Sequence, residues 1–562
     1  MNPPFDQLVK DVIRDTVSAG GSLSAFRSEL AICATIIAVL LLKIVMPRWK
    51  SSAFYVTVLG LLAAILLAFP WNWVSFPWGW LSTEATGIPA AKAIFTGALV
   101  ADSFTVVLRG VLLLFTILFV TFTQLAGVSD QDDMTEFYVL MLGALVGMCL
   151  MISANHILIV MLGVEMASVP CYVLAGMRRN DPKSSEAAMK YAVFGAGTAG
   201  VMLYGMSLLV GVLGSAHLPT MTARLAEMFQ DPSHITAGQS TVLTLGGLML
   251  TVGVAFKLSA VPFHFWAPDV FEGATAEVAA FLSVASKAAA LGLLVRLATG
   301  FAYPSDLFFP ASTVPRDPAA VATAVAALAP VRQYIVALIS VLAAVTCTFG
   351  NLAAYGQMNM KRLLAYSTIA HAGYMMMPVA AAVSLLGGAD QVAAREAARE
   401  AISALIVYIG IYLFMNLAAF AIVAFLRNAI HSEEIADYAG LIRRSPGLTV
   451  CMAIVLFSLV GVPPLAGFTA KWPVFLSLVS ANLRMLLIVG ILNTVLSLFY
   501  YLRVVKVMVM SPEPLYRSAP RIPVFSMVGS YCALLTLPVV VLFFWPRGLL
   551  TWAQLAVSAL FH

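Results

Sequence analysis

The amino-acid sequence predicts an all-α polytopic membrane protein that crosses the bilayer about 14 times. Hydrophobic residues fill 61% of the 562 positions and charged residues only 10%. Because a soluble protein is roughly a quarter charged, so few charges cannot cover a surface in water. Low-charge runs of about 20 residues, the length that spans a bilayer, recur along the whole chain. The composition therefore excludes a soluble enzyme, a disordered protein and a partner of nucleic acid, and it makes the lipid bilayer the expected environment.

The predicted spans are low-charge runs that end at polar or loop-forming residues. They cover residues 30–47, 53–70, 103–127, 135–154, 156–177, 187–213, 240–262, 277–299, 332–357, 363–386, 401–426, 446–478, 484–508 and 523–545. The tryptophan-rich stretch Phe69–Trp80 is typical of an aromatic belt at the membrane interface rather than of a span.

The order of the spans predicts five parts. These are an N-terminal segment (1–29), three N-terminal helices (30–134), a first five-helix repeat of helices 4–8 (135–299), a second, inverted repeat of helices 9–13 (332–508), and helix 14 with its tail (523–562). None of the connections is long enough to form a hydrophilic domain of its own.

Basic residues in alternate loops predict the orientation. The loops contain Arg48 and Lys50, Arg178, Arg179 and Lys183, Lys361 and Arg362, Arg443 and Arg444, and Arg517 and Arg521. Because cytoplasmic loops carry an excess of lysine and arginine, we expect this side to be cytoplasmic and both termini to lie outside. Lys10, Arg14 and Arg27 in the N-terminal stretch run against this bias.

Two similar segments predict broken helices. Residues 256–262 (FKLSAVP) resemble residues 457–463 (FSLVGVP), in the seventh and twelfth spans. A proline lacks the amide proton and clashes with the carbonyl four residues earlier, so each helix should break. The breaking residues are Pro262, Pro463 and Pro464. Interrupted helices in corresponding positions are typical of transporters that are built from inverted repeats around an ion path.

Four charged residues within apolar spans are the strongest functional signal in the sequence. They are Glu165, Lys257, Lys287 and Lys471. A charge at the centre of a transmembrane helix costs roughly 2.5–3.5 kcal/mol on insertion scales, so each of them requires a specific role.

The residue types of this set are suited to proton transfer. Removal from water lowers the pKa of an amine and raises that of a carboxyl, so a lysine that makes and breaks an ion pair can load and release a proton. A static salt bridge between helices is the alternative for Glu165 and one lysine. One glutamate cannot pair with three lysines, which weakens this alternative for the whole set.

Three further residues are candidates, each with a structural alternative. Lys190 opens a span, where a long side chain can instead reach the interface. His264, beside the first break, and His371, deep in the tenth span, could relay protons because imidazole titrates near neutrality. A buried histidine can equally be a hydrogen-bonded core residue. Arg109 and Lys43, near span ends, are interpreted as structural or as reaching the interface.

Two long motifs resemble the antiporter-like membrane subunits of respiratory complex I. The first is KLSAVPFHFWAPDVFEG at residues 257–273, followed by FLSVASK at 281–287. The second is NMKRLLAYSTIAHAGY at residues 359–374. The resemblance extends over nearly all the spans. It implies a membrane subunit that translocates protons through its interior, driven by quinone reduction in other subunits.

The resemblance also implies roles for single residues. Glu165 pairs with Lys257, and the path continues through Lys287 to Lys471 near the exit; we call these four residues the Glu/Lys axis. It further implies that FMN, iron–sulfur clusters and quinone are cofactors of other subunits, with none in this chain. The expected partners are other membrane subunits of the complex, including further antiporter-like subunits. The chain itself has no dinucleotide-binding fingerprint and no cysteine ligand set.

Differences between the members of this family indicate which type of subunit the chain resembles most. Subunit M and the sodium/proton antiporters carry a glutamate where this chain has Lys471, and subunit L carries a long lateral helix, which favours the subunit N type. Relatives often have prolines where this chain has Thr275-Ala-Glu277. A sodium/proton antiporter subunit and a subunit of a ferredoxin- or hydrogenase-linked relative are the alternatives. The alanine- and glycine-rich composition predicts a bacterial inner (plasma) membrane, with a thylakoid-type membrane as the alternative.

Overall fold

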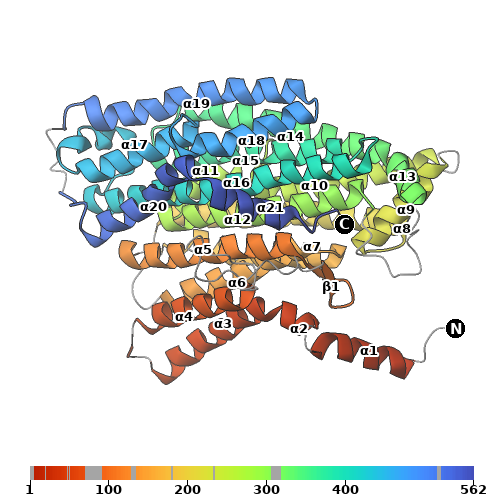
Figure 1. Ribbon diagram of the computed structural model, residues 1–562. Coiled ribbons are helices and arrows are strands. Elements are labelled where there is room, and N and C mark those ends of the chain that lie inside the picture. Colours follow the sequence, from red (N-terminus) through yellow and green to blue (C-terminus); the bar gives the residue numbers. More distant parts are fainter. Residues whose placement is uncertain are drawn as a thin grey trace.

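The protein is a bundle of long helices that run roughly side by side (Figure 1). The computed structural model describes residues 5–18, 21–46, 48–49, 51–69, 91–127, 134–178, 181–231, 235–304, 318–514 and 521–561. The N-terminal helices form a layer on one side of the bundle (Figure 1). Except for Phe69, the predicted aromatic belt lies outside the described residues.

The N-terminal part contains the first three predicted spans. Its helices are α1 (Phe5–Val17), α2 (Ser22–Ala25), α3 (Arg27–Val45), α4 (Ser52–Ala68) and α5 (Ser103–Ala126). A short antiparallel hairpin of β1 (Lys92–Ile94) and β2 (Leu99–Ala101) precedes α5. The spans α3 and α4 pack against each other, and α5 packs against α12 in the main bundle.

Two groups of helices follow, and the fourth helix of each group is broken. The first group is α6 (Met134–Ser153), α7 (Ile157–Ala175), α8 (Pro182–Leu213), the broken pair α10 (Ala237–Leu258) and α11 (Trp266–Gly273), and α12 (Ala276–Ala302), with the short helix α9 (Leu218–Gln230) before α10. The second is α14 (Ala329–Ala354), α15 (Met360–Leu385), α16 (Gln391–Ile430), the broken pair α17 (Pro446–Val460) and α18 (Ala466–Ser480), and α19 (Arg484–Met510). The remaining helices are α13 (Pro318–Ala327), α20 (Met527–Phe544) and α21 (Arg547–Val557).

The structure confirms the predicted spans. Among the described residues, 12 helices are long and apolar enough to cross a membrane. Adding α4 and the broken pair α17–α18 gives one helical crossing for each of the predicted spans. The first and last described helices lead to the same end of the bundle, as an even number of crossings requires (Figure 1). Which of the two ends faces the cytoplasm stays a prediction.

Some boundaries and elements differ from the prediction. The span predicted for residues 401–426 is a helix of 40 residues that begins at Gln391. Its charged first turns are held by the C-terminal segment, because Arg395 and Arg399 donate to the carbonyls of Phe561 and Leu560 at 3.3 and 2.9 Å. The helices α1, α9, α13 and α21 and the hairpin lie outside the predicted spans. The start of α12 agrees, with Thr275 as its N-cap.

Two helices occupy the centre of the bundle. The apolar stretches of α12 and α16 are 100% and 94% buried inside the protein, whereas those of α3 and α8 are only 28% buried. A helix that is hydrophobic on all sides is stable in the core of a bundle, so this placement follows from composition. Lys287 of α12 is therefore far from lipid as well as from water.

A buried ion pair fixes the position of α12. Arg296 of α12 donates to both oxygens of Asp102 at 2.6 and 2.7 Å, and to the Thr105 hydroxyl at 2.8 Å. Asp102 is also the N-cap of α5, where it accepts from the Thr105 amide. A second buried pair, Glu29–Arg109 at 2.6 Å, joins α3 to α5. The structural interpretation of Arg109 is thus correct, although its side chain is buried rather than at an interface.

Removing one partner of the α5–α12 pair should destabilise the protein. Arg296→Met leaves the Asp102 carboxylate buried without its partner, and we expect a loss of about 3–5 kcal/mol of unfolding free energy. Asp102→Asn keeps the N-cap but leaves the arginine unpaired, with a loss of similar size. The measurement is the unfolding of detergent-purified protein.

The double variant tests the physical reason. Because Asp102→Asn/Arg296→Met leaves no unpaired charge, it should lose less than the sum of the two single losses. Lys43→Ala is a matched control, since Lys43 lies 3.9 Å from Glu136 in a solvent-accessible pair and should cost under about 1 kcal/mol. Equal effects of Lys43→Ala and Arg296→Met would contradict the account.

Candidate functional site

The first half of the Glu/Lys axis is built on α7 and α10, which both pack against α8. Glu165 lies in the middle of α7, and Lys257 lies in the last turn of α10. Lys257 Nζ and Glu165 Oε1 are buried and have no hydrogen-bond partner among the described residues. The two charges act on each other across the gap, but they do not form a contact ion pair.

Pro262 explains where α10 ends. The last helical residue is Leu258, four residues before the proline, which is the residue whose carbonyl the proline ring would meet. Ser259 then has a left-handed backbone, with φ of 55°. The Phe256 carbonyl accepts from Trp266 Nε1 at 3.1 Å, and the Val261 amide donates to the Thr346 hydroxyl at 2.9 Å. The backbone of this break is therefore held by side chains other than Lys257.

The second break is closed by a lysine. Helix α17 ends at Val460, four residues before Pro464, and Gly461 follows with φ of 89°. Lys471 Nζ donates to the Val460 carbonyl at 2.9 Å and lies 4.4 Å from the centre of the Tyr374 ring. A Cβ atom at Gly461 would lie 2.9 Å from the Lys471 side chain, so this position requires glycine. The Val460 carbonyl, four residues before Pro464, therefore accepts from a lysine side chain.

The centre of the site lies between α12, α15, α16 and α19. Lys287 Nζ donates to the Thr368 carbonyl of α15 at 3.0 Å. His371, one turn further along α15, contacts the hydroxyl of Tyr408 with Nδ1 at 2.8 Å and that of Tyr501 with Nε2 at 3.4 Å. Lys287 and His371 are 1% and 2% exposed. On α15, His371 lies between Thr368, whose carbonyl binds Lys287, and Tyr374, whose ring Lys471 Nζ approaches to 4.4 Å.

Polar side chains that the sequence analysis missed connect Lys287 with His371. Asn416 of α16 donates to the Tyr412 hydroxyl at 2.8 Å and to the Thr368 hydroxyl at 3.4 Å. The ring of Tyr412 lies 5.2 Å from that of His371. The sequence contains a pattern that could have identified these residues. Positions 408, 412 and 416 are four residues apart and so share one face of a helix that is otherwise apolar.

The structure does not bring Lys190 and His264 into this path. Lys190 pairs with Glu186 and Asp269, both at 2.6 Å, and its side chain is 34% exposed. It belongs to a charge cluster in which Lys190 and Lys183 of α8 and Arg362 of α15 bind the two carboxylates of α11, Asp269 and Glu272. This geometry favours the structural alternative, in which the cluster holds α11.

His264 lies beside the first break, as expected from its position. Its ring packs against Phe349, with 4.4 Å between the ring centres, and its buried Nδ1 has no partner among the described residues. No contact joins it to the lysines in this part of the chain.

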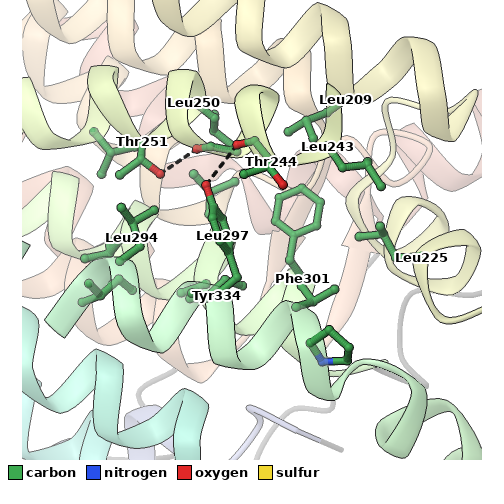
Figure 2. Close-up of a pocket in the computed structure, with 18 of the residues that line it drawn as sticks. Leu209, Leu225, Leu243, Thr244, Leu250, Thr251, Leu294, Leu297, Phe301 and Tyr334 are labelled. Atoms are coloured by element: carbon green, nitrogen blue, oxygen red, sulfur yellow. Dashed lines mark hydrogen bonds between the residues drawn. The ribbon is translucent and has the colours of Figure 1, made fainter. Parts of the chain in front are cut away.

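An apolar cavity of about 270 Å³ lies beside the axis (Figure 2). It is lined by α8, α9, α10, α12 and α14, and its lining residue Val254 is one turn before Lys257. Figure 2 shows Thr244, Thr251 and Tyr334 at its edge, and their hydroxyls donate to backbone carbonyls of α10 at 2.8–3.0 Å. The lining contains no acidic, basic or histidine side chain. The cavity therefore gives α10 apolar surroundings and offers no group for proton transfer.

No group of three or more histidine, cysteine, aspartate or glutamate side chains that could hold a metal ion occurs among the described residues. The chemistry available to this site is therefore that of its lysines, its glutamate, His371 and their hydroxyl partners.

Several known proteins are similar to this chain in sequence and in fold. The family model described as "NADH:quinone oxidoreductase/Mrp antiporter, TM" matches residues 154–309 and 298–497. The NADH-quinone oxidoreductase subunit N of Anaeromyxobacter sp. (strain Fw109-5) is 34% identical over 543 residues, which are 95% of this chain and 96% of that protein. The chain belongs to the NADH-quinone oxidoreductase subunit N family.

Other members of the family agree. The subunit N of Rhodospirillum rubrum is 36% identical over 471 residues, 83% of this chain and 85% of that protein. A chain of respiratory complex I from Thermus thermophilus is 26% identical and superposes with a TM-score of 0.67 over 94% of this chain and 99% of its own length. The fold of this subunit N family chain is thus that of an antiporter-like membrane subunit.

Substitutions of Glu165 and Lys257 test whether these two side chains act together in proton pumping. Because each acts on the other's charge, Glu165→Ala and Lys257→Ala should each lower proton pumping, and the double variant should lose less than the sum of the single losses. Pumping is measured per NADH oxidised in membranes with equal amounts of assembled complex. Lys183→Ala, in the peripheral charge cluster, is the control. Fully additive losses would mean that the two residues act independently.

Proposed function

We propose that this chain is a proton-translocating membrane subunit of an NADH-quinone oxidoreductase. Protons move through the Glu/Lys axis, with His371 between Lys287 and Lys471. Quinone reduction in other subunits drives the movement, and FMN, iron–sulfur clusters and quinone are the cofactors of those subunits. This chain then belongs to an enzyme as its translocating part and performs no redox chemistry of its own.

One observation carries the proposal: among the described residues, no carboxylate forms a contact ion pair with any of three buried lysines. Lys257, Lys287 and Lys471 are 1–4% exposed. In the described part of the chain, the buried carboxylates with contact ion pairs are Glu29 and Asp102, whose partners are Arg109 and Arg296. The buried Lys361 pairs with Glu433, which is 13% exposed. Lysines kept for structure alone would be expected in such pairs, because an unpaired charge is costly in a membrane.

The partners that the lysines do have suit a group that changes its charge. Lys287 and Lys471 each donate to a backbone carbonyl. A neutral amine donates to a carbonyl as an ammonium does, so the contact survives the loss of a proton. A carboxylate would instead favour the charged form strongly. These contacts fix the position of each nitrogen and leave its charge free to change.

The relatives support a complex as the setting. The relatives are subunits of NADH-quinone oxidoreductase, and the similar Thermus thermophilus chain is part of respiratory complex I, so we propose other membrane subunits, including further antiporter-like ones, as partners. The spans make this a membrane protein. We propose the bacterial inner (plasma) membrane as its location.

A subunit of a sodium/proton antiporter is the second candidate. Lys471 argues against it, because the resemblance places a glutamate at this position in those proteins. A ferredoxin- or hydrogenase-linked complex is the third candidate. Purification of the native complex and identification of its electron-input subunits separates the three.

Substitutions of Lys471 distinguish proton exchange from structural charge. Lys471→Ala removes the exchangeable proton. Lys471→Arg keeps a cation that can reach the Val460 carbonyl and the Tyr374 ring, but arginine holds its proton too tightly to release it. Both variants should therefore lose proton pumping per NADH oxidised while the complex assembles. Wild-type pumping in the arginine variant would leave Lys471 as a structural charge only, and Lys43→Arg is the matched control.

A further inference from the structure

His371 has a tyrosine hydroxyl at each ring nitrogen. Nδ1 lies 2.8 Å from the hydroxyl of Tyr408 on α16, and Nε2 lies 3.4 Å from that of Tyr501 on α19. The Tyr501 hydroxyl also bonds to the Ser367 hydroxyl. His371 and both tyrosines are 1–2% exposed, so no bulk water competes for these contacts.

A hydroxyl is both a donor and an acceptor, and this matters for an imidazole. A neutral histidine has one nitrogen that donates and one that accepts. A carbonyl or a carboxylate at either nitrogen would fix which one carries the proton. With hydroxyls on both sides, either tautomer keeps both hydrogen bonds, because each hydroxyl can turn its proton toward or away from the ring.

The two nitrogens face different ends of the path. On the Nε2 side, the Tyr501 hydroxyl bonds to that of Ser367. The next residue in the chain is Thr368, whose carbonyl accepts from Lys287. On the Nδ1 side, Tyr408 lies on α16, and the His371 ring lies 6.0 Å from the ring of Tyr374, which Lys471 Nζ approaches to 4.4 Å.

We propose that Tyr408 and Tyr501 are positioning residues that let His371 pass protons between Lys287 and Lys471, by keeping both tautomers of its ring hydrogen-bonded. This inference rests on the proposed function and adds the residues that act through His371. A proton that arrives at Nε2 forms an imidazolium. The Tyr408 hydroxyl then accepts the proton on Nδ1 and releases its own proton toward Lys471, so that the tyrosine stays neutral. The ring is left as the other tautomer, and rotation of the hydroxyl protons prepares the next transfer.

Removal of single hydroxyls tests the proposal. Tyr408→Phe and Tyr501→Phe keep the ring and its packing but leave one nitrogen without its partner, so each should lower proton pumping per NADH to the level of Lys287→Met. Since the two contacts act in series, the double variant should lose no more than either single variant.

Tyr500→Phe is the matched control. Tyr500 neighbours Tyr501 on the same helix, is 1% exposed, and its hydroxyl donates to Asn351 at 3.0 Å rather than to His371. It should pump as the wild type does. A loss in Tyr500→Phe as large as in Tyr501→Phe would attribute the effect to packing of the tyrosines and overturn the proposal.

His371→Gln decides the question without changing a tyrosine, and also if a tyrosine variant fails to assemble. Glutamine offers one donor and one acceptor group but cannot exchange them, so pumping should fall as in Lys287→Met. Wild-type pumping in His371→Gln, or in both tyrosine variants, would overturn the proposal. If Lys287→Met and Lys471→Ala themselves pump normally, the proposed function is wrong; if they fail while the tyrosine variants pump, only this inference is wrong.

Discussion

The site depends on buried lysines that have no carboxylate in contact with them. Only neutral hydrogen-bond acceptors can then hold their side chains. Lys287 and Lys471 bind backbone carbonyls, and Lys257 Nζ has no partner among the described residues. Asp102 is paired with Arg296 and Glu29 with Arg109, so neither of these buried carboxylates is a partner of the three lysines. The nitrogens of Lys287 and Lys471 are therefore held in position while their charges remain free to change.

The two broken helices use their freed backbone groups differently. In the first break, Trp266 binds the Phe256 carbonyl, and Lys257 is left to interact with Glu165. In the second, Lys471 itself binds the Val460 carbonyl. Backbone polar groups in a bilayer must be satisfied within the protein, and the Lys471 amine satisfies this carbonyl both before and after it loses a proton. Two similar sequence segments thus place their lysines differently. Lys257 at the first break lies near the Glu165 carboxylate, whereas Lys471 at the second break binds a backbone carbonyl.

The spans and the positions of the helix ends could be predicted from the sequence, because they follow from local composition and from proline chemistry. The roles of the four charged residues stay predictions. Pro262 and Pro464 even fix the last helical residues, Leu258 and Val460. What could not be predicted depends on contacts between distant helices. The tyrosine partners of His371 come from α16 and α19, and the role of Arg109 depends on Glu29, 80 residues earlier in the chain. The absence of a contact between Glu165 and Lys257 is likewise a property of three-dimensional packing.

The central claim is that the Glu/Lys axis is one connected path rather than a set of independent sites. The most direct measurement compares proton pumping per NADH in Lys287→Met with that in the triple variant Glu165→Gln/Lys287→Met/Lys471→Met, at equal amounts of assembled complex. Because the proposed axis runs from Glu165 through Lys287 to Lys471, a block at Lys287 already interrupts a connected path, and the triple variant should pump as Lys287→Met does. A further loss in the triple variant, equal to the separate effects of Glu165 and Lys471, would contradict the account.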